Sequence, residues 1–161
     1  MKNKIVILFL LFILNILSYG KLEEEFGFKV LEPIKGKNQT KVIGLENIKN
    51  GDLIMLFESK EFINSDKFIT FSIDMIEYLN KTTKVEIEQV ENNYIICKVS
   101  DTNERLIYLF NKSSHKIITL GVKSLSSLKN SYNYLMANLE LDTPSKLNLK
   151  TIILEYELNS L

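Results

Sequence analysis

The clearest structural pattern in this chain is VEIEQVENNYIICKVSDTNERLIYLFNKSSHKIITLGV, residues 85–122. Four runs within it are rich in β-branched and aromatic residues, and the polar segments ENN, DTNE and NKSS separate them. Runs that recur about every ten residues, with turn-forming segments between them, are typical of consecutive β-hairpins. We therefore predict an antiparallel four-strand meander over about residues 84–122.

The segment after the meander has the pattern of an amphipathic helix. Between Ser124 and Leu141, apolar residues recur at steps of three and four, which places them on one face of a helix. Ser124 can cap the first turn, and Asp142-Thr143-Pro144 is expected to end the helix. We predict a helix over about residues 124–141 whose apolar stripe packs on the sheet: Leu125, Leu128, Tyr132, Leu135 and Leu139.

The face of the meander that receives this helix depends on hairpin register. Candidates for the receiving face are Ile95, Ile107 and Leu109, and a slip of one residue would reverse the set. Tyr134 falls outside the predicted stripe, so we expect it to point away from the sheet.

The first part of the chain predicts further strands. Alternation of apolar and polar residues indicates a strand over 26–30, and a weaker one follows at 41–45. Asn50-Gly51-Asp52 indicates a turn, and the continuously apolar run 53–57 indicates a buried strand.

Two segments admit both a strand and a helix. Alternation at 69–75 favours a strand followed by a short helix from Asp74, against a longer helix that begins at Ser65. Near the C-terminus, Thr143-Pro144 could begin a helix, whereas the β-branched run Thr151-Ile152-Ile153 favours a strand over 146–158. A sheet with helices segregated on its face is an α+β domain, which is the fold class we predict.

The N-terminus has the pattern of a secretory signal. Lys2 and Lys4 precede the apolar run 5–17, which is shorter than the roughly 20 residues that a membrane-spanning helix needs. Ser18-Tyr19-Gly20 places small residues where signal peptidase requires them, so we expect residues 1–20 to be a signal peptide. The alternative is an uncleaved anchor, which would make the protein a membrane-tethered assembly subunit.

The remaining residues, 21–161, have the length of a single α+β domain. They contain 18 basic and 20 acidic residues, a net charge of −2, which argues against a nucleic-acid partner. Cys97 is the only cysteine, so no disulfide can form within the chain. With a single histidine as well, the chain lacks the several Cys and His ligands that a zinc site uses, and we expect no metal or cofactor.

Two segments resemble a known group of exported domains. EFGFKVLEP, residues 25–33, resembles the opening strand of DcrB-like and PsbP-like domains, and YLFNKSSHKIITLGVKSLSSLKNSYNYLMANLEL, residues 108–141, is similar to their final hairpin and helix. The chain departs from the group in having no Trp after Pro33, and residues 142–161 lie outside the resemblance. The resemblance implies an α/β/α sandwich that serves as an accessory or binding domain, with no catalytic residues carried over.

Few residues suggest catalysis. We expect Cys97, among apolar neighbours in a strand, to be an inert buried thiol, and His115, at the edge of a turn, to be a solvated surface residue. A Cys–His pair would need the two strands to be adjacent, and the meander places another strand between them. Glu86 and Glu88 could act as acid and base in hydrolysis, but their alternation with apolar residues is typical of a solvated strand face. The acids Asp52, Glu58 and Glu61 are scattered along the chain.

The sequence therefore favours an exported, non-enzymatic binding or accessory domain of the cell envelope, periplasmic or extracellular. Its partner would be an envelope protein or a small ligand, and it would meet the membrane only transiently, through the signal peptide. The alternatives are a carboxylate-based hydrolytic enzyme and the tethered subunit.

The signal-peptide interpretation predicts where the mature protein begins. N-terminal sequencing of exported protein should start at Lys21, because cleavage after Gly20 places small residues at both positions that the peptidase reads. Material that begins at Met1 and sediments with membranes would contradict this and support the tethered form.

Overall fold

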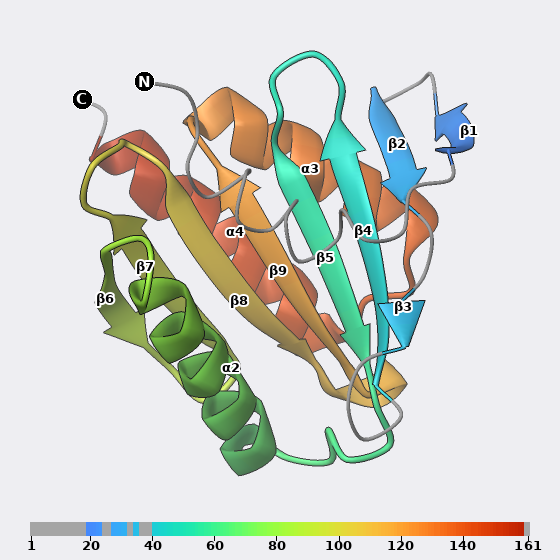
Figure 1. Ribbon diagram of the computed structural model, residues 1–161, viewed down its shortest axis with the longest axis vertical. Helices are drawn as coiled ribbons and strands as arrows, with labels where there is room; N and C mark the ends of the chain where they lie inside the picture. Colours follow the sequence, from blue (N-terminus) through green and yellow to red (C-terminus); the bar gives the residue numbers. More distant parts are fainter. Residues whose placement is uncertain (1–18, 24–26, 32–33, 36–39, 160–161) are drawn as a thin grey trace.

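A computed structural model of the chain describes residues 19–23, 27–31, 34–35 and 40–159. Most of the predicted signal peptide, residues 1–18, lies outside the described residues. The predicted meander is confirmed, because four strands follow one another as antiparallel neighbours (Figure 1). These strands are β6 (Val85–Val90), β7 (Tyr94–Val99), β8 (Arg105–Asn111) and β9 (Lys116–Val122).

The earlier strands extend the same sheet beyond β9. Within the described residues the sheet has nine strands, in the order β1-β2-β4-β5-β9-β8-β7-β6, with β3 also paired to β4. Gly51 connects β4 to β5 with a φ of 72°, which a glycine adopts without strain. The strands predicted over 26–30, 41–45 and 53–57, with the turn before the last of them, are confirmed as β2 (Phe28–Leu31), β4 (Lys41–Asn47) and β5 (Leu53–Glu58). Two short strands were not predicted from the sequence: β1 (Tyr19–Glu23) and β3 (Ile34–Lys35).

The strand predicted over 69–75 is wrong, and the longer helix is right. Helix α2 spans Ser65–Asn80, and the Asn64 side chain accepts a hydrogen bond of 3.0 Å from the backbone N–H of Lys67. The period-two alternation in this segment competes with a helical face at steps of four, four and three, and burial of that face prevails. Its buried residues are Phe68, Ser72, Ile76 and Leu79.

The strand favoured over 146–158 is also wrong. Helix α4 spans Thr143–Leu158, with Pro144 in its first turn. Asp142 begins this helix, since its carboxylate accepts a 2.9 Å hydrogen bond from the backbone N–H of Ser145. Leu149 and Ile152 are fully buried, so tertiary packing overrides the strand preference of the β-branched run.

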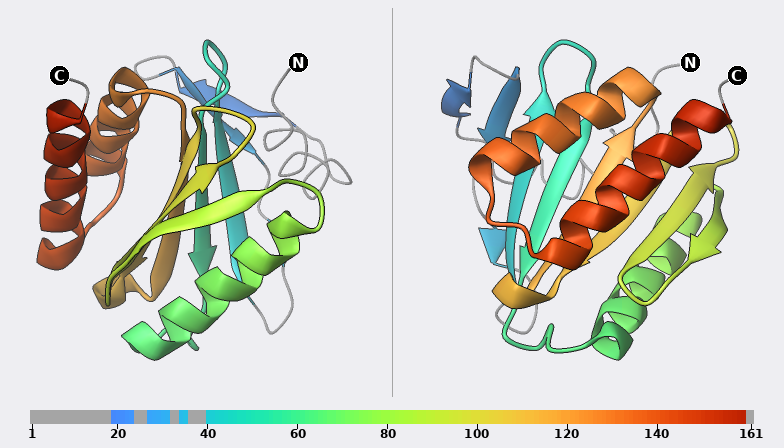
Figure 2. Two further views of the ribbon diagram at one scale, coloured as in Figure 1. Left: turned by 90° about the vertical axis from the view of Figure 1, so that its left-hand side faces the viewer. Right: turned by 180° about the vertical axis from the view of Figure 1, so that it is seen from behind.

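Helices cover both faces of the sheet and produce three layers (Figure 2). Helix α2 lies on one face, while α3 (Leu125–Asn138) and α4 lie side by side on the other. Each face has its own apolar cluster, one containing Phe68 of α2 and the other Leu128 of α3. The structure is therefore α+β, with an antiparallel sheet packed by the predicted amphipathic helix.

Helix α3 begins as predicted but presents a rotated face. The Ser124 hydroxyl accepts a 3.2 Å hydrogen bond from the Ser127 N–H, which confirms the cap. Tyr134, expected to point away, is buried with its ring centroid 4.9 Å from that of Phe28, because β2 brings this Phe ring under the helix. In the predicted stripe, Leu128 and Leu135 are fully buried. The other three members are only half-buried: Leu125, Tyr132 and Leu139. The buried residues are Ser127, Leu128, Ser131, Tyr134 and Leu135.

Register decides which meander residues meet α3 and α4. Ile96 pairs with Ile107, and both belong to the cluster under these helices, together with Leu109. Ile95 pairs with Tyr108 and belongs to the opposite cluster, under α2. The prediction is right for Ile107 and Leu109 and wrong for Ile95, since successive residues of a strand face opposite sides.

Leu135→Ala tests this packing. Leu135 is fully buried between α3 and the sheet, so its truncation should leave a cavity and lower the free energy of unfolding by about 2–5 kcal/mol. Thermal or denaturant unfolding beside the wild type measures the loss. The matched control is Met136→Ala, because Met136 neighbours it on the exposed side of α3. Equal stability of the two variants would contradict the packing.

Candidate functional site

A β-bulge in β6 shapes a cleft that is lined by acidic, basic, amide, aromatic and aliphatic side chains. Ile87 pairs with Cys97 and Gln89 pairs with Ile96, so Glu88 is an extra residue with no partner of its own in β7. A bulge bends the strand and redirects its side chains. As a result, the successive residues Glu88 and Gln89 line the same cleft.

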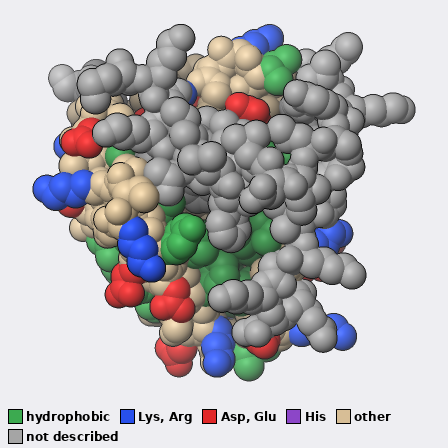
Figure 3. Space-filling view, in the orientation of Figure 1, with side chains coloured by type: hydrophobic (Ala, Val, Ile, Leu, Met, Phe, Trp, Pro, Cys, Tyr) green, Lys and Arg blue, Asp and Glu red, His purple; other side chains and the backbone are tan. Residues whose placement is uncertain are grey.

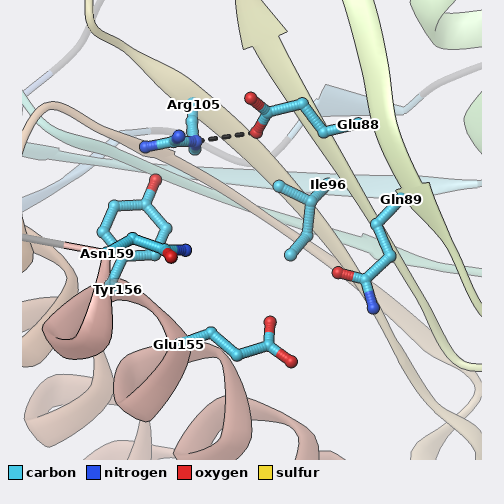
Figure 4. A pocket seen from close by; sticks show the side chains of 7 residues that line it. All are labelled: Glu88, Gln89, Ile96, Arg105, Glu155, Tyr156 and Asn159. Atoms are coloured by element: carbon cyan, nitrogen blue, oxygen red, sulfur yellow. Dashed lines mark hydrogen bonds and ion pairs between the residues drawn. The ribbon is translucent and has the colours of Figure 1, made fainter.

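The cleft lies between the meander and the last turns of α4 (Figure 4). Its volume is about 310 Å³, near the lower end of the range for small-molecule sites. Figure 4 shows side chains from β6, β7 and β8 on one wall and from α4 on the other. The lining residues are Glu88, Gln89, Ile96, Arg105, Glu155, Tyr156 and Asn159.

Arg105 is the central charged group of the cleft and the only arginine in the chain. Its Nε donates a 2.7 Å hydrogen bond to a carboxylate oxygen of Glu88, and its guanidinium carbon lies 4.6 Å from the centre of the Tyr156 ring. The contact with Glu88 raises the pKa of Arg105. Burial raises the pKa of Tyr156, and the hydrogen bond to Arg105 opposes that rise. The three side chains form a fixed unit that joins β6, β8 and α4.

The opposite side of the cleft carries an uncompensated charge. Among the described residues, the Glu155 carboxylate has no ion-pair or hydrogen-bond partner, and it points into the cleft from α4 (Figure 4). Gln89 is positioned by a 2.8 Å hydrogen bond from its amide to the Tyr94 hydroxyl. With Glu88 balanced by Arg105, the lining has a net charge of −1, while Ile96 supplies an apolar surface.

Glu86 and Glu88, considered as an acid–base pair in the sequence analysis, each face a different basic residue. Glu86 is paired with Lys84 at 2.7 Å on the surface, whereas Glu88 is paired with Arg105. Only Glu88 lines the cleft, because the bulge separates the surroundings of the two residues.

The buried-thiol prediction for Cys97 is confirmed. Cys97 is fully buried in the cluster under α2, and burial raises the pKa of its thiol to about 12. Strand β8 lies between Cys97 on β7 and His115 beyond it, as the meander predicts. A thiolate nucleophile is therefore not formed near neutral pH.

His115 is exposed at the turn that leads into β9, with a left-handed φ of 53°. Its Nδ1 lies 3.0 Å from the carbonyl oxygen of Phe62, and it borders two open clefts. Glu58 and Glu61 line one of them, but Glu58 faces Lys116 at 3.9 Å. Ser59 donates its backbone N–H to the His115 carbonyl at 3.2 Å, but in the described part of the chain the His115 ring makes no hydrogen bond to a serine or cysteine side chain, which agrees with the surface role expected for it.

A second polar cluster lies at the opposite end of the sheet, around the β4–β5 turn. Asp52 is only 1 % exposed and accepts a 2.6 Å hydrogen bond from the Asn50 side chain. Glu104 is 8 % exposed, and Lys123 lies 3.9 Å from it while donating 2.7 Å to the Asn50 carbonyl. Burial raises the pKa of both carboxyl groups, and Lys123 opposes the rise. The Lys123 ammonium thus favours the ionised form of two buried carboxyl groups.

No group of three or more His, Cys, Asp or Glu side chains in the described part of the chain could hold a metal ion. Figure 3 shows the face that α2 covers in part, where hydrophobic side chains are visible below the centre of the view and charged ones lie toward its lower and left margins. None of the described helices is long and apolar enough to span a membrane.

No protein-family model, curated protein or solved structure matches this chain.

Of the residues that line the cleft, only Glu88 is a candidate from the sequence. Arg105 is marked only by being the single arginine, and Glu155 and Tyr156 lie in the segment 146–158, for which the sequence favours a strand. The bulge at Glu88 has no marker in the sequence, since it arises from how β6 pairs with β7.

Asp52→Asn tests the buried acid. Since the folded state raises the pKa of Asp52 above its ordinary value of 3.8, the folded protein holds this proton more tightly than the unfolded chain does. The resulting stability is fully present below pH 3.8 and is lost as the pH rises through the folded pKa. The variant should therefore melt at a higher temperature than the wild type at neutral pH, and the gap should close on acidification.

The matched control is Asp101→Asn, an exposed acid in the β7–β8 turn at the same end of the sheet. It should leave the pH profile of the melting temperature unchanged. If the wild type instead melted at a higher temperature than Asp52→Asn at neutral pH, the attraction of Lys123 would outweigh the cost of burying the charged Asp52 carboxylate.

Proposed function

We propose that this protein is an exported, non-enzymatic binding domain of the cell envelope, and that it binds a small cationic ligand in the cleft between the β6 bulge and α4. The observation that carries the proposal is the Glu155 carboxylate, which faces the cleft without a described partner. The export part rests on the N-terminal sequence, and the accessory role is the one that the DcrB-like and PsbP-like resemblance implies.

The first strand is compatible with cleavage after Gly20. The β1–β2 register is irregular between Tyr19 and Leu22 and regular from Leu22 to Glu23. A chain that begins at Lys21 would keep the regular part of this pairing.

The chemistry of the cleft favours an organic ammonium group. A positive charge beside Glu155 would neutralise the lining, and the amides of Gln89 and Asn159 could accept the remaining N–H groups. A short aliphatic chain would pack on Ile96. The Arg105 guanidinium, already held by Glu88 and stacked on Tyr156, would act as a rigid wall rather than as a ligand-binding cation.

A hydrolytic enzyme is the second candidate, because Glu88 and Glu155 line one cleft from opposite walls (Figure 4). The ion pair with Arg105 argues against it, since it occupies one of the two carboxylates that such a mechanism needs. The membrane-tethered subunit stays the form expected if residues 5–20 are not removed.

Titration of isotope-labelled protein with butylamine, followed by NMR, tests the binding proposal. Butylamine should shift resonances of residues that line the cleft, such as Gln89 and Ile96, whereas butyrate and butanol of the same size should not. Glu155→Gln should weaken butylamine binding at least about fivefold, equivalent to about 1 kcal/mol.

The control is Glu77→Gln, an exposed acid on α2 across the sheet, which should bind butylamine like the wild type. A preference for butyrate, or equal binding by Glu155→Gln, would refute a cation site. Turnover of chromogenic glycosides that Glu155→Gln abolishes would establish the hydrolytic alternative instead.

A further inference from the structure

Helix α4 is apolar on both of its sides. Its inner residues Leu149 and Ile152 are fully buried against the sheet. On the outer side, Leu147 and Leu154 are each 58 % exposed and Leu158 is 71 % exposed. A surface helix normally presents polar residues to solvent, and one that is apolar all round is normally covered.

The exposed leucines follow the spacing of a helix-packing seam. Leu147, Thr151, Leu154 and Leu158 lie at steps of four, three and four, as the a and d positions of a heptad repeat do. We name these four residues the α4 ridge. All four residues are exposed, on a helix that lies at the outside of the molecule (Figure 2).

The charges of α4 are arranged against its own dipole. Lys146 and Lys150 lie in the N-terminal half, and Glu155 and Glu157 lie in the C-terminal half. A helix is stabilised by acids near its N-terminus and bases near its C-terminus, so this order is unfavourable within α4. Two copies of α4 placed antiparallel would bring the lysines of each beside the glutamates of the other.

We propose that the α4 ridge packs antiparallel against the α4 ridge of a second copy of this chain, about a two-fold axis. Leu147 then lies opposite Leu158 of the second copy, and Thr151 lies opposite its Leu154. Lys150 flanks Glu157 of the second copy, and the symmetry repeats each contact.

The existing partner of Glu157 does not prevent this. Glu157 contacts Lys129 of α3 at 2.5 Å, but both side chains are about half exposed, and such surface pairs contribute little to stability. One carboxylate has two oxygens and can accept from both lysines.

The seam is short, which sets the expected strength of association. The 16 residues of α4 extend for about 24 Å, and one pair of such helices buries less than the roughly 1,200 Å² of a standard interface. The dimer is therefore a reversible one, with a dissociation constant between micromolar and millimolar values.

Sedimentation velocity of protein recovered from cells that express the full chain tests the proposal, over concentrations up to about 1 mM. The wild type should shift from monomer to dimer with increasing concentration. Leu154→Glu should raise the dissociation constant at least about tenfold. Ile63→Glu is the control, because Ile63 is 53 % exposed in the loop before α2, and it should dimerise like the wild type.

Charge reversal gives a second, independent test. Lys150→Glu alone and Glu157→Lys alone each place like charges across the seam, so each should remain monomeric. An equimolar mixture of the two variants restores both pairs and should form a heterodimer. This result would exclude a non-specific effect of either substitution.

A wild type that stays monomeric at about 1 mM overturns the proposal. So does a dimer that survives Leu154→Glu, or a mixture of the charge variants that does not associate. Binding of a monomeric wild type to anionic phosphatidylglycerol vesicles, lost in Leu154→Glu, would assign the ridge to a lipid surface instead. Butylamine binding is measured separately, so failure of either proposal leaves the other testable.

Discussion

The pairing of β5 with β9 is the constraint on which the rest of the structure depends. It is continuous from Leu53 opposite Gly121 to Glu58 opposite Lys116, and it joins the N-terminal strands to the meander. Segments that lie some 60 residues apart in sequence thereby become one sheet. Because β5 and β9 are central, their side chains are buried on both faces, and each face requires its own covering of helix.

The chain meets this requirement with helices inserted at two points. Helix α2, between β5 and β6, contacts both halves of the sheet: Phe71 packs on Phe57 of β5 at 5.0 Å, and Phe68 stacks on Phe110 of β8 at 5.5 Å. On the other face, α3 and α4 share the covering as an antiparallel pair joined by a short connection. The Asn111 side chain ties this connection to the sheet, donating 2.9 Å to the Glu140 carbonyl.

The candidate site follows from the same arrangement. The position of α4 beside the meander places Glu155 and Tyr156 opposite the β6 bulge, and Arg105 at the start of β8 reaches both sides. The site needs both walls. The bulge contributes the Glu88 carboxylate, which Arg105 neutralises, and α4 contributes the Glu155 carboxylate, which no described residue neutralises. Helix α4 therefore contributes to three parts of the molecule: Leu149 and Ile152 to the core, Glu155 and Tyr156 to the cleft, and its exposed leucines to the α4 ridge.

The sequence by itself determined the meander, its turns, the capped helix α3 and the burial of Cys97. These depend on local patterns: alternation within strands, polar turns between them, and steps of three and four in a helix. Tertiary structure decided that residues 65–80 and 143–158 are helices, although their local alternation or β-branching suggested strands. It also turned α3 so that Tyr134 is buried, placed Ile95 under α2 and created the bulge at Glu88. The physical reason is that burial against a partner surface outweighs local preferences of a few tenths of a kcal/mol per residue, and that the sequence of one segment does not contain the shape of the surface it will meet.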